Sequence, residues 1–193
     1  FEVHMPVLHD LGRSLVFVCR CGWISSWAKS STAPMNTSVV AIIGAGKMGT
    51  ALSSCMKEVS QVRLWDINRD AMPTRITQAT ALLGANIVFF CVPSWALPEA
   101  AASAKADISP GAIIVSVTKG IHPKLLKTSD GVLDDIFSSA HPRVLIGGPM
   151  LAEEIKAHLP TRAVVACADS SAASAVADLF QGSCVSATTT SDI

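Results

Sequence analysis

Apolar residues fall along this chain in short continuous runs, separated by longer segments that are rich in alanine. The runs cover residues 38–43, 61–66, 86–92, 112–117, 143–147 and 162–168. A run that is apolar at nearly every position, with many β-branched residues, predicts a strand buried on both faces of a sheet. The pattern therefore predicts six buried strands.

The segments between the runs have the composition of helices. They cover residues 47–59, 68–83, 94–106, 122–138, 151–157 and 170–180, and several open on the capping residues Ser, Asn or Asp. Pro73 lies inside the second segment and predicts a shortened or kinked helix there. Strands that alternate with helices indicate parallel βαβ units, so the succession predicts an α/β fold with a doubly wound, mostly parallel sheet.

Length and charge narrow the possible functions. With 193 residues the chain can bury one core, and no apolar run reaches the roughly 18 to 20 residues of a membrane span. The 15 basic and 15 acidic residues cancel, so no global field attracts nucleic acid or an anionic membrane. We therefore expect a soluble protein without nucleic-acid or membrane partners, in which an anionic ligand is held locally.

Residues 1–34 differ from the rest of the chain. They lack a helical or strand period and end in a Ser, Thr and Pro cluster that is typical of a linker, after which Met35 is a candidate start. Scattered cations and serines suggest a transit peptide, but Glu2 and Asp10 argue against one. We interpret residues 1–34 as an appendage with no assigned role and 35–193 as one domain.

The cysteines do not form a metal motif. The six are Cys19, Cys21, Cys55, Cys91, Cys167 and Cys184, and they lack the paired CxxC spacing of a structural zinc site. Most lie in apolar segments, so buried, reduced thiols in the cytoplasm are the expectation, with no metal.

Three glycines with GxGxxG spacing follow the first predicted strand and open the first predicted helix. In this context Gly44 permits a tight turn, Gly46 lets a pyrophosphate approach the backbone, and Gly49 lets helix and strand pack closely. Asp66 follows about 20 residues later, where such folds place an acid that binds the ribose hydroxyls of the adenosine. Together these features predict a Rossmann-type dinucleotide site.

The same residues bear on the choice of cofactor. The Asp66 carboxylate repels a ribose 2′-phosphate and favours NAD over NADP, although Arg63 and Arg69 are close enough in sequence to soften that preference. Lys47, inside the glycine loop, either adds positive charge near the phosphates or points to solvent.

Later strand ends carry more specific sequences. Read with "AIIGAGKMGTAL" and "VRLWD", the segments "CVPSWALPEA" (91–100), "PGAIIVSVTKGI" (110–121) and "IGGPMLAEEI" (146–155) resemble the N-terminal domain of NAD(P)-dependent glycerol-3-phosphate dehydrogenase. The resemblance runs from about Val39 to the end of the chain. It implies hydride transfer between NAD(P)H and C2 of dihydroxyacetone phosphate, which forms sn-glycerol 3-phosphate for lipid synthesis or redox balance. It also implies small-molecule substrates and a possible homodimer.

The resemblance also assigns residues. It implies that Lys119 of "VTKG" contacts both substrate and cofactor, as the catalytic lysine of this domain. Lys119 follows a parallel strand, where open α/β folds bind ligands and a cation can hold a phosphate ester or polarise a ketone. The remaining assigned cofactor contacts are Gly44, Gly46, Lys47, Met48, Gly49, Asp66, Pro93, Ser94 and Ala152, and the remaining substrate contacts are Gly148 and Met150.

Other polar residues favour structural roles. We expect Ser94 to cap a helix and line the cofactor groove, because no histidine stands in a GxSxG context that would make it a nucleophile. His122 and His141 each precede a proline and are predicted to be turn residues. Acidic pairs at 153–154 and 134–135 are expected at a helix start and on a solvated face respectively.

The chain departs from the family pattern at two positions. Met150 stands where the family has a hydroxyl near the substrate, and Met48 where an aromatic residue is common. The general acid/base lysine, the phosphate-binding arginine and most of the substrate pocket belong in the family to a C-terminal helical domain. The sequence "TTTSDI" resembles what precedes that domain, so we expect the domain to be missing and the chain to be an inactive fragment. The alternatives are a non-catalytic NAD-binding module and a related reductase such as pyrroline-5-carboxylate reductase.

Overall fold

A computed structural model of the chain describes residues 38–56, 60–72 and 75–193. The appendage predicted for residues 1–34 lies outside the described residues, as do Pro73 and the end of the first predicted helix. Among the described residues, no helix combines the length and the apolar character needed to cross a membrane.

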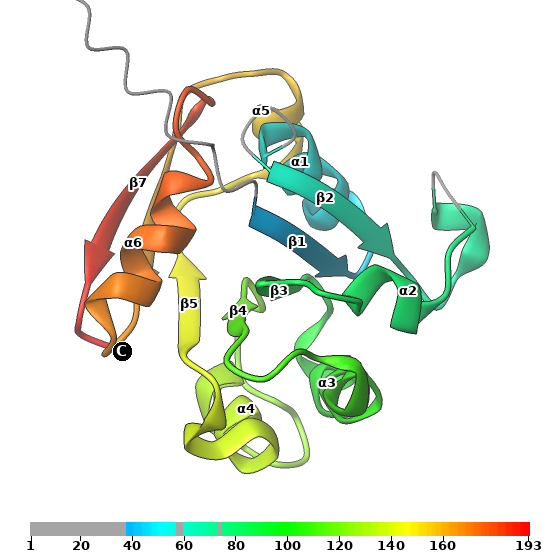
Figure 1. Ribbon diagram of the computed structural model, residues 1–193. Coiled ribbons are helices and arrows are strands. Elements are labelled where there is room, and N and C mark those ends of the chain that lie inside the picture. The colour runs from blue at the N-terminus through cyan, green and yellow to red at the C-terminus, as the bar shows by residue number, and fades with distance from the viewer. Residues whose placement is uncertain (1–37, 57–59, 73–74) are drawn as a thin grey trace, which may run out of the picture. The chain divides into compact units, whose positions relative to one another are not determined.

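Seven strands form one sheet in the order β2-β1-β3-β4-β5-β6-β7 (Figure 1). The strands are β1 (Ser38–Ile43), β2 (Ser60–Trp65), β3 (Ile87–Phe90), β4 (Ile113–Ser116), β5 (Arg143–Gly147), β6 (Thr161–Ala166) and β7 (Val185–Thr190). The first six confirm the predicted runs to within two residues at each end. β1 to β5 are mutually parallel, in register from Ser38 opposite Ser60 to Ser116 opposite Leu145.

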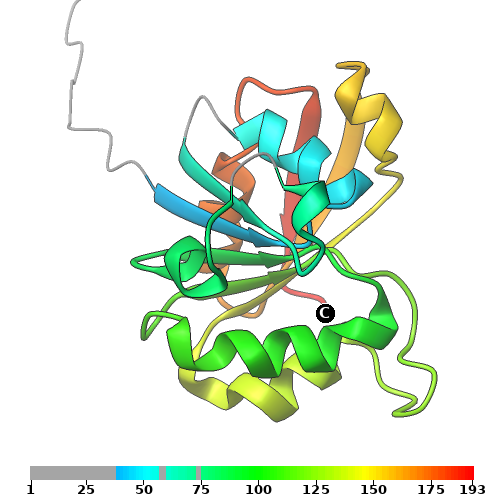
Figure 2. The same cartoon turned by 90° about the vertical axis from the view of Figure 1, so that its right-hand side faces the viewer.

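Helices cover both faces of this sheet. The α-helices are α1 (Lys47–Met56), α2 (Gln78–Leu82), α3 (Leu97–Ala104), α4 (Ser129–Phe137), α5 (Ala152–Lys156) and α6 (Ser170–Asp178). Successive residues of β1 enter different cores: Val40 and Ile42 join the cluster under α1, α5 and α6, whereas Ala41 and Ile43 join the cluster under α2, α3 and α4. Figure 2 shows the resulting three layers. Burial on both sides explains why the strand sequences are continuously apolar, and it confirms the doubly wound prediction.

The helix predicted over 68–83 is wrong in extent. It is replaced by a 3-10 turn, η1 (Arg69–Ala71), and by the five-residue α2. Asn68 caps the first by accepting from the Asp70 N–H, and Thr77 caps the second by accepting from the Thr80 N–H. Each cap starts a separate helical segment, because a capping residue has extended rather than helical backbone angles.

The helix predicted over 122–138 begins later, at Ser129. The preceding residues form a loop closed by a bridge between Ile121 and Thr128. The His122 ring organises this loop: its Nδ1 accepts from the N–H of Leu125 at 3.0 Å and of Lys124 at 3.3 Å. His122 is thus a turn residue, as predicted. His141 follows the 3-10 turn η4 (Ser138–Ala140) with extended backbone, and its Nδ1 lies 2.9 Å from the Ala112 carbonyl oxygen.

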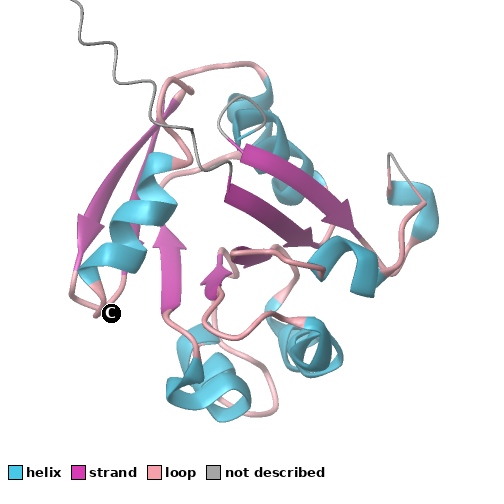
Figure 3. Ribbon diagram, viewed as in Figure 1, coloured by secondary structure: helices cyan, strands magenta, loops and turns pink. Residues whose placement is uncertain are grey.

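The last two strands depart from the parallel pattern. β6 pairs antiparallel with β5, and β7, which the sequence analysis missed, pairs parallel with β6. The connection after β5 covers residues 148–160 and contains the five-residue α5, which packs against α1 (Figure 3). The chain then turns back at the edge where β5 ended, and β6 runs beside β5 in the opposite direction.

Candidate functional site

The site is assembled at the carboxyl ends of the parallel strands. The chain leaves β1 to form β2 on one side and returns as β3 on the other, so the strand order reverses between β1 and β3. Ligands of open α/β sheets bind at such a reversal. The segments that meet along this edge follow β1, β3, β4 and β5, and they carry nearly all the residues that the sequence singled out.

The glycine loop adopts the conformation that its motif predicts. Gly44 has φ of 109°, and a Cβ there would lie 2.5 Å from the Cys91 carbonyl oxygen at the end of β3. A Cβ on Gly49 would overlap the Gly44 carbonyl oxygen, whereas one on Gly46 would meet no atom within 4 Å. Gly44 and Gly49 therefore permit close packing within the protein, and Gly46 keeps the outer side of the loop open. The open side faces the start of α1, whose first N–H groups have no partner within the helix.

Asp66 lies directly after β2 and is joined to the glycine loop. Its Oδ2 accepts from the Ala45 N–H at 2.7 Å and its Oδ1 from the Asn68 N–H at 2.8 Å. Two backbone donors therefore hold the carboxylate beside the loop. Each carboxylate oxygen can accept more than one hydrogen bond, so capacity for a ligand hydroxyl is left.

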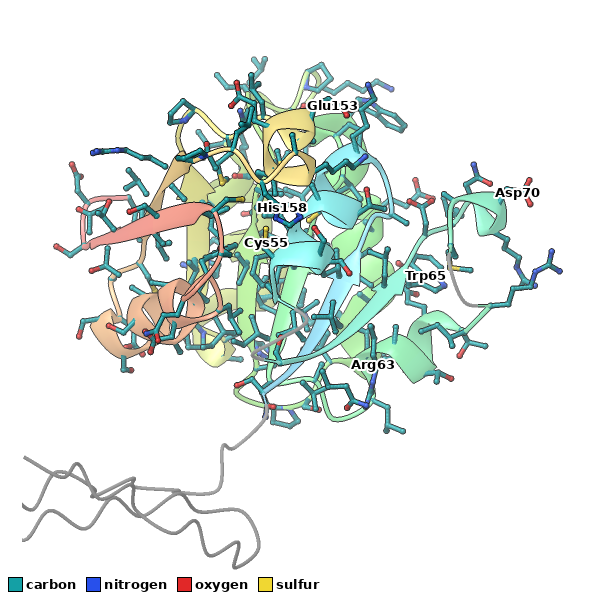
Figure 4. All side chains as sticks on the ribbon, turned by 90° about the horizontal axis from the view of Figure 1, so that it is seen from above. Cys55, Arg63, Trp65, Asp70, Glu153 and His158 are labelled. Carbon is teal, nitrogen blue, oxygen red and sulfur yellow. The ribbon has the colours of Figure 1, made fainter. Side chains whose placement is uncertain are left out.

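The two arginines near Asp66 differ in position. Arg63 donates to the carbonyl oxygens of Leu83 at 2.5 Å and Thr80 at 3.3 Å, which directs it toward α2 (Figure 4). Arg69 follows Asp66 closely in η1 and is exposed. Either arginine could reduce a preference for NAD by attracting the 2′-phosphate of NADP. Arg63, however, is held by the backbone carbonyls of the α2 region.

Lys47 and Met48, the two variable residues of the loop, have different surroundings: Lys47 is exposed and Met48 packs against the core. The Lys47 ammonium lies 3.4 Å from Glu153 Oε1 at the start of α5, with the two side chains 80% and 67% exposed. Met48 packs against the core under α1. Sequence analysis left Lys47 either near the phosphates or in solvent. It did not foresee the pairing with Glu153, which no local spacing signals.

The segments after β3 and β4 are joined by a side chain. Thr118 Oγ1 donates to the Val92 carbonyl oxygen at 2.9 Å. Pro93 takes the cap position of the 3-10 turn η2 (Ser94–Ala96), with no side-chain cap bond. The expectation that Ser94 caps a helix is therefore wrong, because Ser94 is already the first residue of the turn. Trp95, which the sequence analysis passed over, is 68% exposed in the same turn.

Lys119 and the segment after β5 meet across the edge. The Lys119 ammonium lies 3.5 Å from the Met150 carbonyl oxygen. Gly148 has φ of 118°, and a Cβ there would lie 2.9 Å from the Arg162 carbonyl oxygen at the start of β6. Ala152 begins α5 and is partly buried. The contact with Met150 places Lys119 beside the segment that carries Gly148 and Ala152. The binding roles of these three residues stay a prediction.

Met150 requires a correction. Its side chain is only 1% exposed and belongs to the core under α1 and α5. A thioether in that position packs against apolar neighbours, and only the backbone carbonyl reaches Lys119. The expected substrate contact through the Met150 side chain is therefore wrong.

The described cysteines pack against the core, and the acidic residues Asp134 and Asp135 form ion pairs. These cysteines are all free; Cys55, Cys91 and Cys184 are partly buried, and Cys167 is buried. Desolvation against the core raises the pKa of Cys91 to about 12. Asp134 and Asp135 are exposed, as predicted, and pair with Arg143 at 2.9 Å and Lys127 at 2.5 Å respectively. No group of three potential metal ligands occurs in the described part of the chain.

The chain is similar in sequence to known proteins of one enzyme family. The family described as NAD-dependent glycerol-3-phosphate dehydrogenase N-terminus matches residues 74–173. The glycerol-3-phosphate dehydrogenase (NAD(P)+) of Desulfitobacterium hafniense is 32% identical over 163 residues, covering 73% of this chain and 46% of that protein. The enzyme of the same name from Nostoc sp. is 30% identical over 151 residues, covering 77% of this chain and 47% of that protein.

The chain belongs to this family. It spans about half the length of the curated relatives it matches. Among solved structures, the glycerol-3-phosphate dehydrogenase of Coxiella burnetii is similar, with a TM-score of 0.74, 24% identity, and coverage of 83% of this chain and 55% of that one. A pyrroline-5-carboxylate reductase of the same organism reaches a TM-score of 0.63 at 12% identity, with coverage of 81% and 61%. Fold alone therefore does not separate the glycerol-3-phosphate dehydrogenases from that reductase, but the family match does.

Proposed function

We propose that this chain is the cofactor-binding portion of a glycerol-3-phosphate dehydrogenase. The bound cofactor would supply the hydride that passes between the nicotinamide of NAD(P)H and C2 of dihydroxyacetone phosphate. The observation that carries the proposal is the contact of the Asp66 carboxylate with the Ala45 N–H, which joins the ribose-binding acid to the phosphate-binding loop. The chain's membership of the family supports the substrate.

The residues at the edge fit a dinucleotide. Gly46 leaves open space where any other side chain would stand, and the first turn of α1 offers N–H donors and a partial positive charge to a diphosphate. The Asp66 carboxylate can accept from the hydroxyls of the adjoining ribose. The segment with Pro93 and Ser94 follows β3, which lies next to β1, at the same edge of the sheet.

Lys119 is proposed to act on the substrate. Its ammonium stands at the carboxyl end of β4, beside the carbonyl of Met150 and near Gly148. A cation there can hold a phosphate ester or stabilise the negative charge that develops on a ketone oxygen during reduction. Lys119 can therefore position dihydroxyacetone phosphate without itself transferring the proton.

We also propose a preference for NAD over NADP. A 2′-phosphate next to Asp66 would meet like charge, and Arg63 is engaged by backbone carbonyls of the α2 region. Asp66→Asn removes the charge and keeps one acceptor oxygen. We expect it to weaken NADH binding about tenfold, through loss of a charge-assisted hydrogen bond, while NADPH binding weakens less. Calorimetric titration with both nucleotides measures the ratio, and an unchanged ratio would contradict the preference.

The proposed activity is tested by binding and turnover together. The chain is titrated with NADH, and a longer protein that joins this sequence to a C-terminal helical domain of the family is supplied with dihydroxyacetone phosphate while NADH absorbance is followed. Binding with turnover that Lys119→Ala removes supports the whole proposal. Binding without turnover favours the alternative of a non-catalytic NAD-binding module, an alternative supported by the half-length coverage of the relatives. A folded chain that binds neither nucleotide would overturn both.

We also propose a cellular location and an oligomeric state for the protein. Free cysteines throughout the described residues are consistent with the reducing cytoplasm. A homodimer is proposed as the assembled state and is tested by sedimentation of the purified chain.

A further inference from the structure

Lys119 lies between two fixed points of the backbone. On its amino side, Thr118 Oγ1 donates to a backbone carbonyl oxygen just after β3 at 2.9 Å, which ties the chain to the neighbouring strand. On its carboxyl side, a β-bridge between Ile121 and Thr128 closes a loop over residues 121–128. The place of Lys119 therefore depends on whether loop 121–128 keeps its shape.

The ring of His122 is a hydrogen-bond acceptor inside loop 121–128. His122 is buried, with 9% of the residue exposed. Its Nδ1 accepts from the N–H of Leu125 at 3.0 Å and from the N–H of Lys124 at 3.3 Å. Pro123, which lies between, has no N–H. The ring therefore takes the first two backbone donors that follow it along the chain.

The shape of the loop is one that a leucine rarely adopts. Leu126 has φ of 52°, in the left-handed region that is uncommon for residues other than Gly, Asn and Asp. Leu126 is 79% exposed, so packing of its side chain does not hold it there. Instead its N–H donates to the His122 carbonyl oxygen at 2.9 Å, and the His122 N–H donates to the Lys127 carbonyl oxygen at 2.8 Å. The ring and the backbone of His122 thus hold every residue from 124 to 127.

The ring contacts require one tautomer of His122. A nitrogen that accepts hydrogen bonds carries no hydrogen, so the ring is neutral with its hydrogen on Nε2. His141, which also precedes a proline, has the opposite arrangement. Its Nδ1 lies 2.9 Å from the Ala112 carbonyl oxygen, which can only accept, so this Nδ1 carries the hydrogen. His141 is therefore an internal control for the tautomer of His122.

We propose that His122 is a positioning residue for Lys119: its neutral ring holds loop 121–128 closed and thereby keeps the Lys119 ammonium beside the Met150 carbonyl oxygen, 3.5 Å away. The inference rests on the proposed function for the role of Lys119 in holding the substrate. A cation that is already ordered binds a phosphate ester more tightly than a mobile one, because less conformational entropy is lost on binding. His122 acts on the substrate only through Lys119.

The first test replaces the ring by amides of two lengths. In His122→Asn, Oδ1 is attached to the same carbon as the histidine Nδ1 and can accept from the same N–H groups. In His122→Gln, the amide oxygen lies one bond farther along the side chain, and His122→Ala has no acceptor. Amide hydrogen exchange of the full chain measures the result. We expect residues 124–127 to exchange at least about tenfold faster in the Gln and Ala variants, and within about twofold of the parent in the Asn variant.

Peptides from α6 control for the fold, since α6 contributes no hydrogen bond to loop 121–128 among the described residues and should exchange alike in all four proteins. Equal exchange of residues 124–127 in the parent and His122→Ala would overturn the proposal. So would equal exchange in the Asn and Gln variants, because His122 would then act through its volume and not through Nδ1.

The second test measures substrate binding in the longer protein described for the turnover assay. In His122→Ala and His122→Gln we expect the KM for dihydroxyacetone phosphate to rise about tenfold, with His122→Asn within about twofold of the parent. The Kd for NADH should not change, because the glycine loop and Asp66 follow β1 and β2. An unchanged KM in His122→Ala, while the loop exchanges faster, would overturn the positioning of Lys119. A parent protein that binds NADH but never turns over would contradict the proposed function instead, and hydrogen exchange would still decide whether His122 holds the loop.

A third measurement needs no variant to fold. Nitrogen-15 NMR of the parent chain at pH 7.5 distinguishes the two ring nitrogens of each histidine. We expect the hydrogen of His122 on Nε2 and that of His141 on Nδ1. A hydrogen on Nδ1 of His122 would overturn the proposal, since that nitrogen could then accept neither N–H.

Discussion

The sheet contains two regions that differ in strand direction. From β1 to β5 all strands are parallel, so their carboxyl ends, and the segments that follow them, lie at one edge. β6 and β7 run the opposite way, and their carboxyl ends lie at the other edge. The amino end of β6 returns to the site, where the Arg162 carbonyl closely approaches Gly148. Strand direction, rather than proximity in sequence, decides which residues can reach the ligand.

The two regions also differ in how their backbones are packed. In the parallel region the glycine loop touches the end of β3, and side chains on both faces are buried. In the second region β7 is an edge strand with mostly polar, exposed positions. We therefore expect substitutions in the parallel region to have the larger effects.

The largest expected effect is that of Gly49→Ala. The new methyl group would overlap the Gly44 carbonyl oxygen, which is backbone and cannot move aside alone. The result should be a loss of about 3 kcal/mol or more in the free energy of unfolding, measured by urea denaturation.

Gly46→Ala is the matched control for that substitution. Its methyl group meets no atom within 4 Å, so stability should change by less than about 1 kcal/mol. NADH binding should nevertheless weaken at least tenfold, because the methyl group occupies the space proposed for the diphosphate. Equal loss of stability in both variants would contradict the separate roles assigned to the two glycines.

A loss of stability at alkaline pH should arise in part from Cys91, which follows β3 in the parallel region. The pKa of Cys91 is raised to about 12, against an ordinary value of 9.0, by burial. Between these values the unfolded chain loses the Cys91 proton and the folded chain keeps it, so stability present below pH 9 is lost as pH rises, at about 1.4 kcal/mol per pH unit. Chemical denaturation from pH 8 to 10.5 measures the slope. Cys91→Ala should show a shallower slope, and an unchanged slope would rule out this source.

A loss of stability at acid pH should arise instead in the second region, at the start of α6. Asp169 caps α6 by accepting from the N–H groups of Ser171 at 2.9 Å and Ala172 at 3.2 Å. The Ser171 hydroxyl and then these amides lower the pKa of Asp169 below 3.8. The cap's contribution is therefore present above pH 3.8 and is lost as pH falls through the lowered value. Asp169→Ala should lower the melting temperature at pH 7 by about 3 °C and reduce the acid dependence, measured by thermal unfolding between pH 2 and 7.

The smallest effect is expected from the ion pair between Lys47 at the start of α1 and Glu153 in α5. Glu153→Gln removes the charge opposite Lys47, but both side chains are mostly exposed, so stability should change by less than about 0.5 kcal/mol. Lys47 is then free to turn toward a diphosphate, and NADH affinity should rise about twofold at low salt. A double-mutant cycle with Lys47→Met isolates the pair. A loss of affinity in Glu153→Gln would show that Glu153 supports the loop instead.

Local signals explain which elements the sequence predicted. Continuous branched runs such as those of β1 and β3 fit only strands covered on both faces. β7 was missed because its polar, threonine-rich positions are typical of an edge and resemble a linker. The helix expected over 68–83 failed because the caps at Asn68 and Thr77 compete locally with a continuous helix.

The sequence by itself determined the buried strands, the glycine loop and the acid that follows β2, because each depends on neighbours within a few residues or on one βαβ unit. Only the tertiary structure decided the reversal at β6, which no local pattern in the sequence marks. It also decided the burial of the Met150 side chain and the pairing of Lys47 with Glu153. These join residues far apart along the chain, and sheet twist and helix packing bring them together without any periodic trace in the sequence.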